Sequence, residues 1–132
     1  LLEHTGDVKI KAYGNTKEEL FENAVFGMMK ILNPKFEARN LKQTKRTITI
    51  QSPDINALLV DFLSEVNYLR QVDKEAYNKV SFKEFSDTEL EGELSGFGVR
   101  EFGEDIKAVT FHELDIHRNP KGLWETFIVF DV

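Results

Sequence analysis

From residue 79 to residue 131 the sequence shows the two-residue alternation of β-strands and no helical period, which strongly limits the folds this chain can adopt. Segments 79–85 and 89–94 have this character, and residues 107–117 predict one long strand. The sequence Asn-Pro-Lys-Gly at residues 119–122 supplies the Pro and Gly of a tight turn. The strands 107–117 and 123–131 should therefore pair as a hairpin.

The last predicted strand is apolar at both of its parities. One side would present Trp124, Ile128 and Phe130, and the other Leu123, Phe127 and Val129. A strand that is apolar on both faces usually lies in the middle of a covered sheet. We therefore expect residues 123–131 to form a central strand.

The first half of the chain predicts two strand–helix units. Residues 7–13 alternate apolar and polar positions, as a half-buried strand does. Thr16 with Glu19 forms a capping box, and apolar residues at helical spacing then continue to a stop at Asn33 and Pro34.

A second strand over residues 45–51 precedes a second helix that opens at residues 52–54 and extends to about residue 72. The order strand, helix, strand, helix and then several strands predicts an α+β fold, with two helices packed on a mainly antiparallel (mixed) β-sheet. The 132 residues contain no repeat or linker, so a single domain over 1–132 is expected.

The composition excludes several classes of function. The chain has no Cys, which rules out disulfides, thiolate metal sites and a Cys nucleophile and fits a cytoplasmic location. No secretory signal or apolar run of membrane-helix length is visible, so no membrane association is expected. The net charge of −6 disfavours strong direct binding of nucleic acid. Lys42, Lys45 and Arg46 form the densest basic cluster, which is either a local RNA contact or a solvated loop.

Two aspartates lie at opposite ends of the chain, and each lies at the end of a predicted strand. Asp7 opens the first strand, and Asp131 closes the last one at the inward parity of Phe127 and Val129. If Val132 ends the chain, its α-carboxylate stands next to the Asp131 side chain. Should the first and last strands be neighbours, three oxygen donors would converge, which suits Mg²⁺ or Ca²⁺. An Asp that only caps a turn or faces water is the alternative.

Other chemical candidates have ordinary explanations beside the functional ones. His4 could bind a metal or orient Asp7, or be a surface residue near the terminus. Lys107 could hold a phosphate or pair with a carboxylate, or be an exposed lysine. His112 shares a parity with Leu114 and Ile116, which favours a buried structural role. Asp61 and Glu65 share a helix face, where they are either paired ligands or a solvated surface.

Five short motifs in order resemble those of the archease family. They are residues 4–8 (His-Thr-Gly-Asp-Val), with Gly6 where the family usually has Ala, residues 12–14 with the helix that follows, and residues 58–65, 106–112 and 127–132. The resemblance covers nearly the whole chain and is weakest over 33–47 and 71–88.

The resemblance implies an accessory protein, not an enzyme. Archeases assist the RtcB-type RNA ligase of tRNA splicing and RNA repair, which joins a 2′,3′-cyclic phosphate end to a 5′-hydroxyl end using GTP and Mn²⁺. They promote guanylylation of the ligase and its multiple turnover. The family's metal site would correspond here to Asp7, Asp131 and the carboxylate of Val132, with Lys107 tied to activity. The divalent ion could be Mg²⁺, Mn²⁺ or Ca²⁺.

Two alternatives belong to other functional classes. An archease-like chain could modulate the specificity of a tRNA cytosine methyltransferase through a docking surface without a metal. It could instead be a small metal-dependent hydrolase that uses Asp7, Asp131 and His4, although no phosphate loop, dinucleotide fingerprint or nucleophile elbow is present.

Overall fold

The computed structural model describes residues 6–36 and 42–132, which form eight strands and two helices. Their order is β1 (Asp7–Gly14), α1 (Lys17–Leu32), β2 (Pro34–Phe36), β3 (Gln43–Gln51), α2 (Ile55–Asp73), β4 (Glu75–Phe85), β5 (Glu89–Phe102), β6 (Ala108–Thr110), β7 (His117–Arg118) and β8 (Trp124–Asp131). Every strand pair among these residues is antiparallel.

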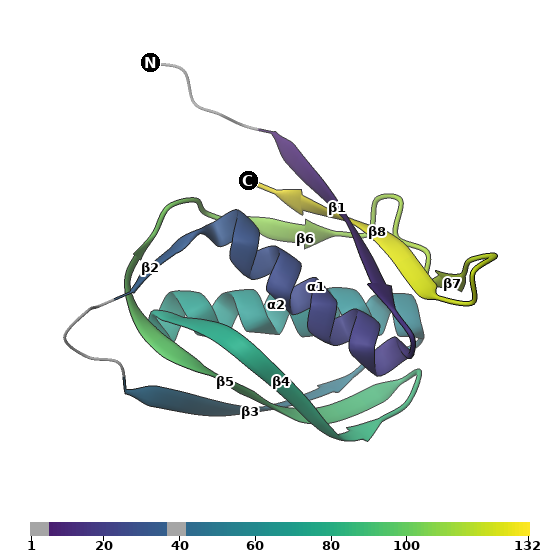
Figure 1. The fold of residues 1–132 in the computed structure, drawn as a ribbon, viewed down its shortest axis with the longest axis horizontal. Coiled ribbons are helices and arrows are strands. Elements are labelled where there is room, and N and C mark those ends of the chain that lie inside the picture. The colour runs from purple at the N-terminus through teal and green to yellow at the C-terminus, as the bar shows by residue number, and fades with distance from the viewer. Residues whose placement is uncertain (1–5, 37–41) are drawn as a thin grey trace.

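The first sheet joins the two ends of the described chain. β8 lies between β1 and β6 and also pairs with β7, so the prediction that the last strand is central is confirmed. Figure 1 shows the start of β1 beside the end of β8. The core-facing positions of this sheet include Ala12, Ile128 and Phe130, which are buried.

The second sheet is built around β5, which pairs with β2, β3 and β4. At Gly96 the backbones of β4 and β5 come very close, since a Cβ added there would lie 1.8 Å from the carbonyl oxygen of Ala76. Gly96 is therefore required for strand pairing and does not end the strand.

Both helices lie between the two sheets (Figure 1). α1 packs against β1 and β4, and α2 packs against β3, β4 and β6. The apolar stripes predicted from helical spacing are buried, with Phe21 and Phe62 completely inaccessible. The predicted α+β class is confirmed, although the helices separate two sheets where one had been expected. Neither helix in the described part of the chain has the length and apolar character needed to cross a membrane.

The helix ends follow the predicted local chemistry. The Glu19 N–H donates to Oγ1 of Thr16 (3.1 Å), and the Glu19 carboxylate accepts from the Asn15 N–H (3.1 Å), one residue earlier than in the standard capping box. Asn33 ends α1 in the left-handed region (φ 48°). Asp54 caps α2 by accepting from the Ala57 N–H (2.8 Å).

The prediction of one long strand over 107–117 is wrong. In this segment only the short strands β6 and β7 pair with β8, and the residues between them turn at Glu113, whose φ is +60°. Side chains take up backbone N–H groups there that a strand would use: Oγ1 of Thr126 accepts from Asp115 (2.9 Å), and Oδ1 of Asn56 accepts from Ile116 (2.9 Å).

Other boundaries differ from the prediction by a few residues or more. β3 begins at Gln43, β4 begins at Glu75 and β5 continues to Phe102, while the three-residue β2 was not predicted. Of the basic cluster, Arg46 turns inward and binds the buried Glu75 with two hydrogen bonds (2.9 and 2.8 Å). It is therefore engaged within the fold and is not part of a solvated loop.

Candidate metal site at the paired chain ends

Asp7 and Asp131 are direct partners across β1 and β8. The Val132 N–H donates to the Gly6 carbonyl at 3.0 Å, which makes Gly6 and Val132 a hydrogen-bonded pair and the adjacent aspartates a non-hydrogen-bonded pair. In such a pair the Cα atoms are about 4.5 Å apart and the two side chains lie on the same face of the sheet. The two carboxylates therefore lie close together where β1 begins and β8 ends.

The face of the sheet that carries these carboxylates differs from the prediction. Asp131 shares the parity of Phe127 and Val129, but the core cluster contains the opposite parity, Ile128 and Phe130. The aspartates therefore lie on the face directed away from the helices. Asp7 is exposed and Asp131 is half-buried. An outward face gives access to solvent, to an ion or to a docked protein.

The two lysines of β1 on this face are already paired. Lys9 binds Glu113 (3.1 Å), and Lys11 binds Glu125 (3.2 Å). Within residues 6–36 and 42–132, neither aspartate carboxylate has a hydrogen bond or an ion pair. These lysine–glutamate pairs were not predicted from the sequence, although the alternation of Lys9 and Lys11 along β1 predicts acidic partners on the same face.

Lys107 and Val132 adjoin the aspartate pair through their backbones. The Lys107 N–H donates to the Asp131 carbonyl oxygen at 2.7 Å, and Ala108 is the β6 partner of Asp131. The Lys107 side chain is exposed and, among the described residues, it makes no ion pair within 4.0 Å. Lys107 therefore lies directly before β6 and does not open a long strand.

The other candidate residues do not join this region. His4 lies outside the described residues. His112 is exposed in the turn between β6 and β7, so the prediction that it is buried is wrong. Asp61 accepts a hydrogen bond from the Ser52 hydroxyl. In the part of the chain that the structure describes, no group of three His, Cys, Asp or Glu side chains is arranged to hold a metal ion.

The donor set of the aspartate pair is still compatible with a divalent cation. Two carboxylates fixed opposite each other repel, and a bound cation would relieve this repulsion. Carboxylate oxygens are the ligands that Mg²⁺, Mn²⁺ and Ca²⁺ prefer. The two side chains supply fewer oxygens than such ions use, so further ligands would be the Val132 carboxylate, water or groups of another molecule.

Comparison with known proteins identifies the family. The sequence profile of the archease protein family matches residues 1–132. This chain belongs to the archease family. The archease of Methanosarcina mazei is 35% identical over 139 residues, covering 99% of this chain and 93% of the relative. The archease of Pyrococcus furiosus is 29% identical over 138 residues, covering 98% and 95%.

Two solved structures share the archease fold. A crystal structure from Thermotoga maritima, described as an archease and possible chaperone, has a TM-score of 0.73 at 22% identity and covers 100% of this chain and 95% of its own. The solution structure of Methanobacterium thermoautotrophicum protein 1598 has a TM-score of 0.69 at 27% identity, with 99% and 96% covered.

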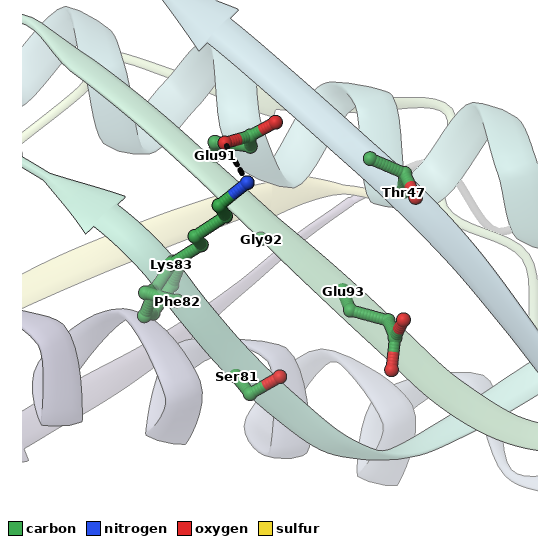
Figure 2. A pocket seen from close by; sticks show the side chains of 7 residues that line it. All are labelled: Thr47, Ser81, Phe82, Lys83, Glu91, Gly92 and Glu93. Atoms are coloured by element: carbon green, nitrogen blue, oxygen red, sulfur yellow. Dashed lines mark ion pairs between the residues drawn. The ribbon is translucent and has the colours of Figure 1, made fainter.

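A separate hollow lies on the outer face of the second sheet of this archease-family chain. Figure 2 shows its lining from β3, β4 and β5, where Lys83 points toward Glu91 at 3.9 Å. Its volume is about 340 Å³, and it contains none of the predicted site residues. The hollow and the aspartate pair are therefore independent features on different sheets.

His117 connects the segment between β6 and β7 to the central strand. Its Nδ1 lies 2.8 Å from the Asp115 carbonyl oxygen, and its Nε2 lies 3.2 Å from the Glu125 carboxylate. A neutral imidazole has one N–H, so both contacts are hydrogen bonds only when His117 is protonated. The Asp115 carbonyl and then the Glu125 carboxylate raise the pKa of His117 above its ordinary value of 6.5.

Replacing His117 by Gln should flatten the pH dependence of stability above pH 6.5. The raised pKa means that the stabilising contribution is complete below the unfolded-state pKa and is lost as the pH rises through the folded-state pKa. The melting temperature of the wild-type protein should therefore fall more steeply above pH 6.5 than that of His117→Gln. An NMR titration midpoint for His117 at or below 6.5 would contradict this expectation.

Proposed function

We propose that this chain is a non-catalytic, metal-binding activator of an RtcB-type RNA ligase. Membership of the archease family supports the partner, and the direct opposition of Asp7 and Asp131 supports the metal site. The description of the Thermotoga maritima relative as a possible chaperone is consistent with a role exerted on another protein. The net charge of −6 suits a partner that is basic because it binds RNA.

In this proposal Asp7 and Asp131 supply the side-chain ligands, and the carboxylate of Val132 completes the set where Val132 ends the chain. When bound, the divalent ion would neutralise the two carboxylates and take its further ligands from water or from a molecule docked on the outer face of the first sheet. Lys107, held next to Asp131 by its backbone, would extend its ammonium group toward the same docked surface. His4 is proposed as a supporting residue.

The test is an assay of ligase guanylylation by GTP, with and without this protein, over a titration of Mn²⁺. Wild-type protein should increase the rate and the number of turnovers, whereas Asp131→Asn should return both to the values of the ligase alone. Glu84→Gln provides the matched control, because Glu84 is an exposed carboxylate on β4 of the second sheet. Lys107→Ala should reduce the stimulation without abolishing Mn²⁺ binding.

The alternatives make different predictions in the same experiments. Full activation of the ligase by Asp131→Asn would reject the metal-dependent mechanism. Stimulation of a tRNA cytosine methyltransferase alone, equal for wild type and Asp7→Asn, would favour the modulator of methyltransferase specificity. Turnover of cyclic-phosphate substrates by the isolated chain would favour the hydrolase.

A further inference from the structure

A buried arginine on α2 contacts the segment that leads to the aspartate pair. Arg70 is only 3% exposed. Its Nε donates to the Asn67 amide oxygen (2.7 Å), and its Nη2 donates to the Asp105 carboxylate (2.8 Å) and to the Ile106 carbonyl (3.1 Å). The guanidinium also lies 4.9 Å from the centre of the Phe102 ring. All of these groups belong to α2, to the end of β5 or to the connection between β5 and β6.

One peptide unit links this network to Asp131. The carbonyl of Ile106 accepts from Arg70 and also from the Asn67 amide (3.0 Å). The N–H of the same peptide unit belongs to Lys107 and donates to the Asp131 carbonyl at 2.7 Å. The peptide between Ile106 and Lys107 is therefore fixed on one side by α2 and on the other by the end of β8.

The strand that follows is too short to fix its own position. β6 has three residues, and its first residue, Ala108, is the partner of Asp131. Short strands contribute few ladder hydrogen bonds, so the register of β6 depends on what holds its ends. The hydrogen bonds to the Ile106 carbonyl hold the chain at the residue before Lys107, and Lys107 directly precedes β6.

The choice of arginine at this position is informative. An apolar side chain of similar volume would often stabilise a buried position as well as or better than an ion pair does. Arg70 instead makes directional bonds to side chains and to a backbone carbonyl, which add geometric specificity as well as stability. Such bonds suit a residue that orients a neighbouring site.

We propose that Arg70, together with Asn67, is a positioning residue for Asp131 and Lys107. By fixing the Ile106–Lys107 peptide, Arg70 sets the position of the Asp131 backbone against Asp7 and directs Lys107 toward the same edge of the sheet. The role in metal affinity rests on the proposed metal-binding function, whereas the fixation of the peptide does not.

The experiment compares Arg70→Met with Arg46→Met. Arg46 likewise binds a carboxylate, that of the buried Glu75, but it does so on β3 of the second sheet, on the opposite side of the helices (Figure 1). Melting temperatures are measured first, and all later measurements use a temperature at which every variant is folded. A loss of Mn²⁺ affinity caused only by reduced stability would then follow the fall in melting temperature of each variant.

Two readouts follow, Mn²⁺ affinity by calorimetry and hydrogen exchange of the Lys107 amide by NMR. Arg70→Met should weaken Mn²⁺ binding by about tenfold, as loss of an outer-shell partner does. Exchange of the Lys107 amide should accelerate on the order of tenfold, while that of Ile128 in the centre of β8 should follow global stability. Arg46→Met should change neither quantity. Arg70→Lys should retain part of the wild-type Mn²⁺ affinity and part of the protection of the Lys107 amide.

Unchanged Mn²⁺ affinity together with a fully protected Lys107 amide in Arg70→Met would overturn the proposal. Equal effects of Arg70→Met and Arg46→Met would also overturn it. If the wild-type protein does not bind Mn²⁺, the proposed metal function fails, and the exchange of the Lys107 amide alone decides whether Arg70 fixes this peptide.

Discussion

Asp131→Asn is expected to raise the melting temperature of the metal-free protein and to abolish the increase that Mn²⁺ gives the wild-type protein. The first effect arises because like charges at directly opposed strand positions destabilise a sheet, here by about 0.5 kcal/mol with Asp7 exposed. For a chain of this length that corresponds to a rise of about 2 °C. The second effect arises because one of the two side-chain ligands is lost.

The loss of the Mn²⁺ response should be the larger effect. A ligand present at 100 times its dissociation constant stabilises the folded state by about 2.7 kcal/mol, or about 10 °C for this chain. Asp7→Asn should behave as Asp131→Asn does, and the double variant should show no further gain, since a single repulsion is removed once. Glu84→Gln should retain the full response. A large Mn²⁺ response in Asp131→Asn would exclude a site shared by the two aspartates.

Phe21→Ala should cause the largest loss of stability, about 3–5 kcal/mol. Phe21 is completely buried, and its ring centroid lies 4.9 Å from that of Phe85 and 5.7 Å from that of Phe62. Removing the ring leaves a cavity where α1, α2 and β4 meet, because the neighbouring rings are held by separate elements. Chemical denaturation with urea measures the change in the free energy of unfolding.

Phe36→Ala is the matched control for this substitution. Phe36 lies on β2 and is 49% exposed, so the same change of side chain should cost less than about 0.5 kcal/mol. A loss below about 1 kcal/mol for Phe21→Ala would mean that the cluster of Phe21, Phe62 and Phe85 is not the centre of the core.

The helices could be predicted because two independent signals agree at each of them. The apolar spacing identifies the buried stripe, and Thr16 and Asp54 each accept the hydrogen bond that a helix start requires. The strands were predicted less well. The continuation of β5 beyond residue 94 was not predicted, although Gly96 allows the close approach of β4 and β5 there. Lys74 ends α2 in the left-handed region without a glycine to mark the stop.

The prediction of one long strand over residues 107–117 was wrong for a reason that the alternation of residues in the sequence cannot reveal. The apolar residues Leu114 and Ile116 keep a strand period, but backbone N–H groups of this segment donate to Oγ1 of Thr126 and Oδ1 of Asn56, which holds it outside the ladder. Only the tertiary structure brings these side chains to the backbone. A two-residue alternation of apolar residues is therefore a weaker signal of a β-strand where polar side chains of other elements can bind the backbone.

The proximity of Asp7 and Asp131 could be predicted from the sequence, but the face of the sheet that carries them was predicted wrongly. The location of Asp7 and Asp131 at the ends of two strands, with the family resemblance, indicated that they meet, and the register confirms that they are partners. The parity of Asp131 was assigned inward because Phe127 and Val129 are apolar. Arg70 was not identified from the sequence because charged residues are mostly exposed, although it lies four residues after the buried Val66.

The most direct test of a shared cation site is anomalous diffraction from crystals of this protein grown with Mn²⁺. We expect one strong peak between the carboxylates of Asp7 and Asp131, within about 2.0–2.6 Å of an oxygen from each, and its loss in Asp131→Asn. Peaks bound only at other carboxylates, with none between these two residues, would contradict it.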